Sequence, residues 1–362
     1  MKHKVITILG TRPEIIRLSA LIKALDNHPL IDHRWIHTGQ NKQPFLHDVF
    51  LKDLSLRLPD YQLQGEKLFL LDNRKQLENE LVNIFEKEKP KVCIVLGDTY
   101  SAVAALVAKS MHIKLVHLEA GNRCYDPKSP EEKNRVMLDQ AADINGCYSV
   151  EAQNHLVQEN ILTPSFITGS PLREVYETLP YVDDSKILDQ LNLTPNAYYV
   201  WSTHRVENID NVNDLLNVLD TLNTLATWDS QKTILVSGHP RFIEKLSHRS
   251  FKLLKNITIC EPFGLLDYLM LQHHSFAVLS DSGSLNEEAD IVGFHGINLR
   301  KSHERDEAEK IPVTDLTHFD WNKIQTSLMK RKTNAPLKDQ VSAYRNNHFS
   351  TIVMNAILGM LT

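Results

Sequence analysis

Short apolar runs alternate with amphipathic stretches through the first half of the chain. Apolar residues at helical spacing, as in Glu14–Asp26, predict helices, and the short apolar runs between such stretches predict strands. The expected strands are Val5–Leu9, His33–His37, Val92–Leu96 and Leu115–Glu119, and the other expected helices are Gln76–Glu88 and Thr99–His112. Strands that alternate with helices build parallel, doubly wound sheets, so we predict an α/β fold.

A second set of apolar runs follows a break in the pattern near residues 168–171. After a polar stretch, the expected strands are Tyr198–Thr203, Thr233–Ser237, Ile257–Cys260, Ala277–Ser280 and Ile297–Leu299. We therefore predict two Rossmann-like domains that face a cleft, residues 1–170 and 171–339, with a linker near 170–195. The segment Gln340–Leu361 is expected to be a helix that packs on the first domain. A chain of 362 residues is long enough for two cores.

The composition argues against several classes of function. A formal net charge of −5 disfavours general nucleic-acid binding, which needs a basic surface. No apolar stretch approaches the length of a membrane span, and the chain begins directly with a strand-like segment. We therefore expect no membrane anchor, no signal peptide and a cytoplasmic location. Four scattered cysteines indicate reduced thiols, and the 17 histidines form no metal-binding motif, so we expect no metal.

Carboxylates follow two of the expected strands. Asp98 ends the run VCIVLGD, and Glu119 opens the polar run EAGNRCYDPKSPEEKNR, which also contains Glu131 and Arg135. Neighbouring parallel strands end at the same edge of a sheet, where open α/β folds bind ligands, so Asp98 and Glu119 should lie close together. Carboxylates gathered at such an edge are typical acids and bases of an active site.

Two other strand ends carry groups suited to an anionic ligand. Arg12 lies in the turn after the first strand and can bind a phosphate or carboxylate through two hydrogen bonds. Ser282 and Gly283 precede an expected helix, where amide groups can bind a diphosphate, and Glu288 one turn later can accept hydrogen bonds from a ribose. The alternatives are a surface arginine that caps a loop and an ordinary helix N-terminus with acidic first-turn residues.

Histidines occupy further strand ends. His204 and His239 each follow an expected strand, where a histidine can change protonation near neutral pH or donate to a phosphate. His303 and Arg305 lie in the charged loop after the last expected strand and would line the cleft. Considered alone, a histidine at the end of a strand is more often structural, and a charged loop alone indicates little. Their coincidence at the carboxyl ends of strands in two domains favours a common site. No GxGxxG or GxxxxGK[ST] motif is present, which disfavours a dinucleotide or a P-loop.

The sequence contains, in order, the motifs GTRPEIIRL, GDT, EAGNR, PEEKNR, THR, DSGS and HER. Together they resemble the non-hydrolysing UDP-N-acetylglucosamine 2-epimerase family, from Val5 to about Glu309. The resemblance implies a two-domain fold like that of B-type glycosyltransferases and an isomerase that needs neither metal nor nicotinamide. It also implies a homodimer that binds a UDP-sugar.

The resemblance assigns roles to individual residues. The catalytic groups would be Asp98, Glu119, Glu131 and His204, and the nucleotide-contacting groups Arg12, Ser282, Gly283, Glu288 and Arg305. We add to the substrate-binding residues Arg17, Arg135, His239 and Ser284. Arg17 stands where the family usually has lysine, and Ser284 where it has glycine. Gln40 and Gln43 fall where bacterial members bind a second, regulatory nucleotide sugar.

Two departures from the common family spelling point to a subgroup. Asn122 replaces the leucine of EAGLR, and the common TTER is here Ser302-His303-Glu304-Arg305. These spellings resemble the members that convert UDP-2-acetamido-2,6-dideoxy-L-talose into UDP-N-acetyl-L-fucosamine for capsule or O-antigen synthesis, with Asn122 and His303 reading the sugar. The alternative substrates are UDP-GlcNAc and UDP-ManNAc. A glycosyltransferase of the same architecture, a hydrolysing epimerase and a catalytically silent nucleotide-sugar-binding protein also stay open.

Overall fold

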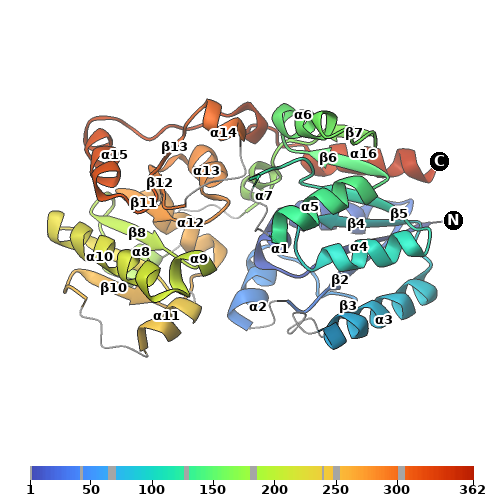
Figure 1. The fold of residues 1–362 in the computed structure, drawn as a ribbon, viewed down its shortest axis with the longest axis horizontal. Helices are drawn as coiled ribbons and strands as arrows, with labels where there is room; N and C mark the ends of the chain where they lie inside the picture. Colours follow the sequence, from blue (N-terminus) through green and yellow to red (C-terminus); the bar gives the residue numbers. More distant parts are fainter. Residues whose placement is uncertain are drawn as a thin grey trace. The chain divides into compact units, whose positions relative to one another are not determined.

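The chain forms two compact units, one made of Met1–Thr178 with Ser342–Thr362 and the other of Leu179–Val341. The computed structural model describes residues 2–40, 44–63, 71–125, 130–179, 186–238, 240–247, 253–300 and 306–362. Each unit contains a parallel sheet with helices on both faces (Figure 1). The predicted α/β class with two doubly wound sheets is therefore confirmed.

In the first unit, the described strands form one seven-stranded parallel sheet. The strands are β1 His3–Leu9, β2 Ile31–His37, β3 Tyr61–Gln62, β4 Val92–Leu96, β5 Lys114–Leu118, β6 Ile144–Cys147 and β7 Ser165–Ile167. Their order is β3-β2-β1-β4-β5-β6-β7, so the direction of winding reverses between β1 and β4, where Ile8 lies beside Val95. In such folds, ligands bind beside the carboxyl ends of the two strands at this switch point.

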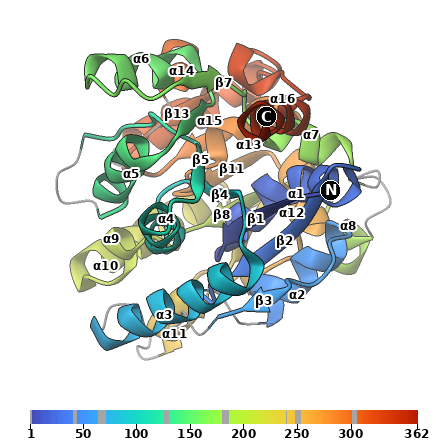
Figure 2. The same ribbon diagram turned by 90° about the vertical axis from the view of Figure 1, so that its right-hand side faces the viewer.

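Helices cover both faces of this sheet. They are α1 Arg12–Asn27, α2 Pro44–Asp53, α3 Leu71–Glu88, α4 Ser101–Ser110, α5 Pro130–Ala141, α6 Val150–Gln158, α7 Leu172–Glu177 and α16 Phe349–Leu361. On one face α3, α4 and α5 lie in a row, and their apolar side chains pack with Ile6, Ile8, Cys93 and Val95 (Figure 2). On the other face α1 contacts α7 and α16, the last segment of the chain.

The C-terminal segment differs from its prediction. In place of a helix over Gln340–Leu361, the structure has one 3-10 turn at Ser342–Tyr344, and α16 begins only at Phe349. The amide of Ser170 donates to the carbonyl of Ala343 at 2.8 Å. Tertiary bonds of this kind take the place of intrahelical ones, so the predicted helix is wrong over residues 340–348.

The second unit repeats the plan of the first. Its described strands are β8 Tyr198–Ser202, β9 Thr233–Ser237, β10 Ile257–Cys260, β11 Ala277–Ser280, β12 Gly296–Asn298 and β13 Thr314–Leu316. They form a parallel sheet in the order β10-β9-β8-β11-β12-β13. The switch point lies between β8 and β11, where Ser202 lies beside Ser280.

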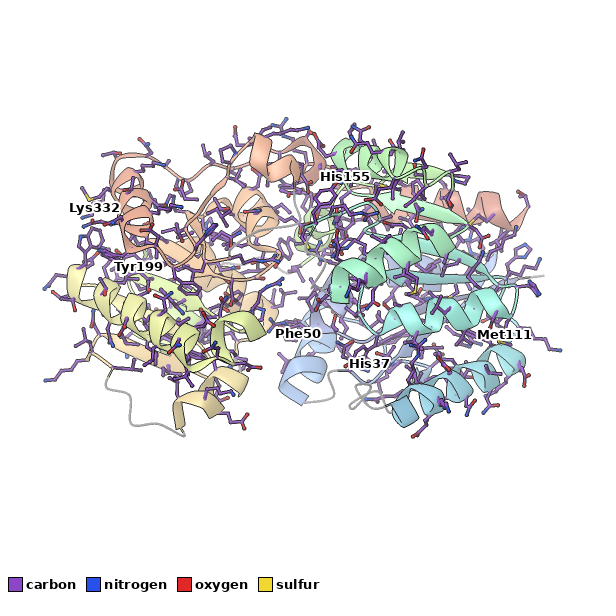
Figure 3. The ribbon with its side chains drawn as sticks, viewed as in Figure 1. His37, Phe50, Met111, His155, Tyr199 and Lys332 are labelled. Atoms are coloured by element: carbon purple, nitrogen blue, oxygen red, sulfur yellow. The ribbon has the colours of Figure 1, made fainter. Side chains whose placement is uncertain are left out.

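Alternate residues of β8 reach two apolar layers. The helices of the second unit are α8 Ile187–Gln190, α9 Val206–Ile209, α10 Val212–Trp228, α11 Pro240–Ser247, α12 Leu265–His274, α13 Leu285–Glu288, α14 Asp306–Lys310 and α15 Trp321–Thr333, and a π-helical turn, Ala289–Gly293, continues α13. Tyr199, labelled in Figure 3, and Trp201 pack with α10 and α15, whereas Tyr198 and Val200 pack with α12 and α13.

Across the described parts of the chain, no helix has the length and apolarity that crossing a membrane requires.

Candidate active site

A buried carboxylate joins the two loops at the switch point of the first unit. Glu14, in the first turn of α1, accepts hydrogen bonds at Oε2 from the amides of Gly10 and Thr11, at 2.9 and 2.8 Å. Its Oε1 accepts hydrogen bonds from the hydroxyls of Thr99 and Ser101, which follow β4, at 2.7 and 3.1 Å. Burial raises the pKa of Glu14, and hydrogen bonds oppose that rise in part. Glu14 therefore fixes the loop after β1 against the loop after β4.

Asp98 lies in the turn after β4 and is held from α5. Arg135 donates from Nη2 to the Asp98 carboxylate, and Asn134 donates from Nδ2 to the Asp98 backbone carbonyl at 2.8 Å. The Arg135 side chain is buried, whereas 16% of the Asp98 side chain is exposed. A charged, directional partner of this kind holds a carboxylate in one place. Asp98 is therefore a partly accessible carboxylate that the hydrogen bond from Arg135 holds in place.

Glu119 follows β5 in a strained backbone conformation. The strand was expected to end on Glu119 but ends at Leu118, and Glu119 has a left-handed φ of 66°. This turn brings Glu119 Oε2 to 3.5 Å from the point that a Cβ on Gly97 would occupy. Asn122 Nδ2 lies 3.4 Å from Glu119 Oε1. The carboxylate therefore lies beside the residue that precedes Asp98, and strain of this kind is typical of functional sites.

A buried charged cluster lies beneath the turn that leads to Asp98. His117, on β5, has Nε2 at 3.0 Å from the carbonyl oxygen of Gly97 and Nδ1 at 2.9 Å from Asp139 Oδ1. Arg123 Nη2 lies 2.7 Å from Asp139 Oδ2. Burial alone would raise the pKa of Asp139, but the hydrogen bonds and charges of His117 and Arg123 outweigh it and lower that pKa. The cluster therefore fixes the end of β4 from below.

Glu131 and Glu132 are neighbours in the first turn of α5 but have different surroundings. Glu132 is buried and accepts hydrogen bonds from the amides of Cys124 and Tyr125, at 3.1 and 3.2 Å, and from Arg135 Nη1 at 3.2 Å. Glu132 therefore holds the loop after β5 against α5. Glu131 is exposed at the surface of its unit, and its catalytic role stays a prediction.

Arg12 and Arg17 both lie on α1 beside aromatic rings. The guanidinium carbon of Arg12 is 5.6 Å from the ring centre of Phe50, which Figure 3 labels on α2. Arg17 is buried, and its guanidinium carbon is 5.6 Å from the ring centre of Tyr148. Cation–π contacts of this kind restrain a long side chain. Arg12 is thus held at the start of α1, at the switch point, and Arg17 is held further along the same helix; the substrate-binding roles of both stay predictions.

Gln40 also lies at the switch point of the first unit. Its Oε1 accepts a hydrogen bond from the amide of Tyr100 at 3.3 Å. A Cβ on Gly10 would lie 3.4 Å from the Cβ of Gln40 and only 1.8 Å from Thr38 Oγ1. The chain therefore needs glycine at position 10, because any side chain there would overlap Thr38. The regulatory role of Gln40 stays a prediction.

Asp281 has the corresponding place in the second unit. It follows β11, is fully buried, and accepts hydrogen bonds from the amides of His204 and Arg205, each at 3.1 Å, and from Asn208 Nδ2 at 2.9 Å. His204 Nδ1 lies 3.2 Å from Asp281 Oδ1, and 29% of the His204 side chain is exposed. Asp281 therefore joins the loop after β11 to the loop after β8.

The serine-rich segment after Asp281 holds Glu288 in place. Ser282 Oγ and Ser284 Oγ are 3.0 Å apart, and Ser284 Oγ donates to Glu288 Oε1 at 2.7 Å. Gln272, on α12, donates from Nε2 to Glu288 Oε2 at 2.8 Å. The Ser284 hydroxyl therefore orients Glu288.

Two arginines that were not among the predicted site residues, Arg205 and Arg300, converge on Gly283. A Cβ on Gly283 would lie 3.5 Å from Arg300 Nη1 and 3.6 Å from Arg205 Nη2. Arg205 Nε also donates to the carbonyl of Asp281 at 3.1 Å. Guanidinium groups beside a partly exposed glycine are well suited to a diphosphate. Arg205 belongs to the THR motif and Arg300 directly follows an expected strand, which are the signals that could have identified them.

Four predicted site residues lie outside the described parts of the chain: Gln43, His239, His303 and Arg305. Among the residues that are described, no three His, Cys, Asp or Glu side chains gather as a metal site requires. The expectation that the protein needs neither metal nor nicotinamide stays a prediction.

Comparison with known proteins places the chain in a family. The family model described as UDP-N-acetylglucosamine 2-epimerase matches residues 23–358. The UDP-N-acetylglucosamine 2-epimerase of Methanocaldococcus jannaschii is 33% identical over 338 residues, which cover 89% of this chain and 90% of that protein. The UDP-2,3-diacetamido-2,3-dideoxy-D-glucuronate 2-epimerase of Pseudomonas aeruginosa is 29% identical and covers 83% of this chain and 84% of its own length.

Solved structures share the fold. The crystal structure of the M. jannaschii UDP-GlcNAc 2-epimerase in complex with UDP-GlcNAc and UDP matches with a TM-score of 0.89 at 30% identity, over 98% of this chain and 99% of that one. Acinetobacter baumannii MurG is 13% identical with a TM-score of 0.53, over 99% of this chain and 100% of that one, and shares the fold alone. By its match to the family model and to these relatives, the chain belongs to the UDP-N-acetylglucosamine 2-epimerase family.

Proposed function

We propose that the protein is an isomerase that inverts C2 of a UDP-linked N-acetylamino sugar without net hydrolysis. Family membership supports this proposal, since the relatives are named as 2-epimerases. Within the structure, one observation carries it: the carboxylate of Glu119 lies beside Gly97, the residue before Asp98, at the ends of adjacent strands β4 and β5. Carboxylates placed in this way can exchange protons with one carbon of a sugar.

The chemistry of C2 favours an elimination. The C2 hydrogen of an acetamido sugar is not adjacent to a carbonyl, so direct deprotonation gives a carbanion that nothing stabilises. If the C1–O bond to UDP breaks as a base takes the C2 proton, the products are a 2-acetamidoglycal and UDP. In the return step, a proton adds to the other face of C2 and a diphosphate oxygen re-forms the bond to C1. Atoms and charge balance without water or an oxidant.

The first unit supplies the proton carriers in this scheme. A fixed group reaches only one face of C2, so inversion needs two carriers. Asp98 is held by Arg135, and Glu119 is held by its left-handed turn, so we propose these two as the pair. Glu131 is the third candidate, and near-normal turnover by Glu131→Gln would remove it.

The second unit supplies the groups that stabilise UDP. Negative charge grows on the diphosphate as the C1–O bond breaks, and preorganised donors stabilise such charge. Arg205 and Arg300 converge on Gly283, and His204 follows β8 in the same unit. Glu288 is oriented by hydrogen bonds and is proposed to accept hydrogen bonds from the ribose hydroxyls.

For the sugar, we propose UDP-2-acetamido-2,6-dideoxy-L-talose as substrate and UDP-N-acetyl-L-fucosamine as product. The support is the spelling at Asn122 and His303, together with the contact between Asn122 and the Glu119 carboxylate. The second candidate is the interconversion of UDP-GlcNAc and UDP-ManNAc, which the names of the archaeal relatives favour. The P. aeruginosa relative, at 29% identity, is named for a third sugar, a D-glucuronate derivative, so sugar preference varies among the relatives.

Proton NMR of the purified protein with each candidate UDP-sugar in deuterated water tests the proposal. An epimerase of this type removes the C2 proton signal and produces the epimer with deuterium at C2. We expect the L-talose derivative to exchange faster than UDP-GlcNAc. The opposite order would make the second candidate the substrate, and exchange with neither sugar would refute the 2-epimerase proposal.

Chromatography of the same reactions separates the rival functions. A glycosyltransferase would transfer the sugar to an acceptor without deuterium at C2. A hydrolysing epimerase would accumulate free sugar and UDP, and a silent binding protein would bind UDP without any product. We expect UDP and free sugar to stay at trace levels, since the intermediates return to UDP-sugar.

The double variant Asn122→Leu with His303→Thr tests the choice of sugar. It restores the common family residues, so we expect the ratio of kcat/KM for UDP-GlcNAc to that for the L-talose derivative to rise at least about tenfold, the scale of one or two specific contacts. Asn27→Leu, an exposed change, serves as the control. An unchanged ratio would show that these positions do not read the sugar.

The resemblance also supports a homodimer that works without metal or nicotinamide, and we propose both. A solution mass of twice the 41.4 kDa chain, and full activity after treatment with EDTA and desalting, are the expected results.

A further inference from the structure

One carboxylate in the second unit holds both the backbone and the ring of His204. Asp281 Oδ1 lies 3.2 Å from His204 Nδ1, and both of its oxygens lie 3.1–3.2 Å from the His204 amide nitrogen. Arg205 and Asn208 donate to the same carboxylate. Asp281 has no exposed surface, so its oxygens are satisfied within the protein.

We propose that Asp281 is a positioning residue for the reaction: it keeps a proton on His204 Nδ1 and so makes Nε2 the nitrogen that acts on the diphosphate. This inference rests on the proposed 2-epimerase function. An ionised carboxylate accepts hydrogen bonds and attracts positive charge, so a proton on the ring nitrogen 3.2 Å from it is favoured over a proton on the other ring nitrogen. The tautomer of a histidine is set in this way by the partner of its other nitrogen.

The charges around His204 give Asp281 a second effect. Arg205 Nη2 and Arg300 Nη1 both approach Gly283, two residues after Asp281. These guanidinium groups disfavour a further positive charge close by, and the Asp281 carboxylate offsets them. His204 can take up a proton from solvent at Nε2 and, as negative charge develops on the diphosphate, donate a hydrogen bond from Nε2 as an imidazolium, with Asp281 stabilising the cation.

A purely structural role for Asp281 makes different predictions. If the carboxylate only ties two loops together, Asp281→Asn should lower stability and affect catalysis equally whether or not His204 is present. If it acts through His204, its loss should matter little once the imidazole is gone. A double-mutant cycle with Asp281→Asn and His204→Asn therefore separates the two roles.

Kinetics with the full chain give the first readout. We expect Asp281→Asn to lower kcat about 10²-fold or more with little change in KM, because a misplaced proton removes transition-state stabilisation rather than substrate binding. The double variant should be no slower than His204→Asn alone within about threefold. Additive losses in the double variant would overturn the proposal.

Asp229 provides a matched control in the same unit. It accepts hydrogen bonds from Tyr199 Oη at 2.7 Å and Lys232 Nζ at 3.0 Å, after α10 and away from the switch point. Asp229→Asn removes a carboxylate of similar hydrogen bonding and should lower thermal stability while leaving kcat within about twofold. An equal kcat loss in Asp229→Asn and Asp281→Asn would show a general effect of lost stability and contradict the proposal.

Nitrogen NMR of 15N-histidine-labelled protein gives a readout that needs no turnover. The His204 signals are assigned by their loss in His204→Asn. We expect the neutral wild-type ring to carry its proton on Nδ1 and Asp281→Asn to shift the population toward Nε2–H. A wild-type ring protonated on Nε2 would overturn the proposal even if Asp281→Asn does not fold. Failure of the wild type to exchange C2 hydrogen with any candidate sugar would instead refute the proposed function and leave the tautomer result intact.

Discussion

The two units fix their switch points with the same device, used in opposite directions. In the first unit, Glu14 lies after β1 and reaches the hydroxyls that follow β4. In the second, Asp281 lies after β11 and reaches back to the amides that follow β8. Both carboxylates are buried, and each must gather hydrogen-bond donors from two loops to be satisfied. A buried carboxylate without hydrogen-bond donors would cost stability. Each carboxylate therefore holds together the two loops that supply its donors, and these loops carry the candidate active-site residues.

The partners of the two carboxylates differ in charge. Glu14 is bonded by amides and hydroxyls, which add no positive charge near the carboxylates that follow β4 and β5. Asp281 lies beside His204, with Arg205 and Arg300 close to the next turn. The position in the fold thus determines where each site forms, and the charge of the partners determines its chemistry. In the proposed reaction, the first unit transfers protons and the second binds an anion.

Replacing a carboxylate by an amide in each unit tests whether the first unit transfers protons and the second binds the nucleotide. We expect Asp98→Asn or Glu119→Gln to lower kcat at least about 10²-fold, the usual scale for general acid–base groups, with little change in KM. Glu288→Gln should mainly raise KM, because its proposed contact is with the ribose and is present before and during the reaction. Steady-state kinetics by NMR, with calorimetry of UDP binding, measure both effects.

The opposite split would contradict the comparison. If Glu288→Gln lowered kcat as much as Asp98→Asn at unchanged KM, the second unit would also carry chemistry. If Asp98→Asn abolished UDP binding, the first unit would be part of the nucleotide site.

Removing the tie in the first unit sharpens the comparison. In Glu14→Gln, an NH2 group replaces one of the two oxygens that accept hydrogen bonds, so the donors there lose their acceptor. We therefore expect the free energy of unfolding to fall by about 2–4 kcal/mol, and kcat to fall as the two loops shift relative to each other. Glu88→Gln is the control, because Glu88 is also buried in this unit but pairs with Lys4 at 2.6 Å. The control should lose stability and keep kcat. Urea unfolding and kinetics test both, and full activity in Glu14→Gln would show that the tie does not position the site.

The sequence predicted the central strands well because they are buried on both sides. The observed bounds of β4, Val92–Leu96, and of β11, Ala277–Ser280, match the predicted ones, since continuous apolar runs end sharply at polar residues. Short strands nearer the sheet edges were missed. β6, Ile144–Cys147, contains asparagine and glycine, and β7 has only three residues, so neither has a periodic pattern to detect.

The candidate site could be predicted only in part, for a related reason. Asp98 and His204 were identifiable because each lies two residues after the end of a strand that begins as an apolar run. The ties made by Glu14 and Asp281 could not be predicted, because their partners are far away in sequence. Glu14 and Thr99 are 85 residues apart, and the contact exists only because β1 and β4 are neighbours at the switch point. Knowledge of strand order, which local patterns do not contain, is needed to find such pairs.

The two units should also differ in their response to acid. Burial lowers the pKa of His295 in the second unit to about 4, and its Nε2 lies 2.9 Å from Ser327 Oγ. In the first unit, burial also lowers the pKa of His33, but Asp26 at 2.7 Å opposes this. A histidine held neutral in the folded state contributes stability above its unfolded pKa, and that stability is lost as the pH falls toward the folded pKa. His295 should therefore cost the second unit about 2–3 kcal/mol between pH 6.5 and 4.

Tryptophan fluorescence during urea unfolding at pH 7 and pH 5 measures this difference. In a Trp35→Phe background the remaining tryptophans, all in the second unit, report on that unit alone. We expect His295→Gln to make the stability of the second unit depend less steeply on pH, and an unchanged slope would remove His295 as the cause.

The smallest expected effect concerns strain at the end of β5. Glu119 and Lys89 both have left-handed backbone conformations, with φ of 66° and 49°, but only Glu119 is a candidate catalytic residue. Relief of such strain by glycine raises the free energy of unfolding by about 1–2 kcal/mol, and the greater freedom of glycine in the unfolded chain lowers it by about 0.5–1 kcal/mol. We therefore expect Glu119→Gly to raise the free energy of unfolding by about 0.5–1 kcal/mol although it abolishes activity.

Lys89→Gly is the matched control for this prediction. Lys89 is exposed at the end of α3, so its replacement should give a similar gain in stability and leave kcat unchanged. Equal gains in the two variants would show that the first unit keeps a strained carboxylate at β5 for function rather than for folding. A loss of stability in Glu119→Gly beside a gain in Lys89→Gly would show that the Glu119 side chain supports the fold, and the strain would then have no functional meaning.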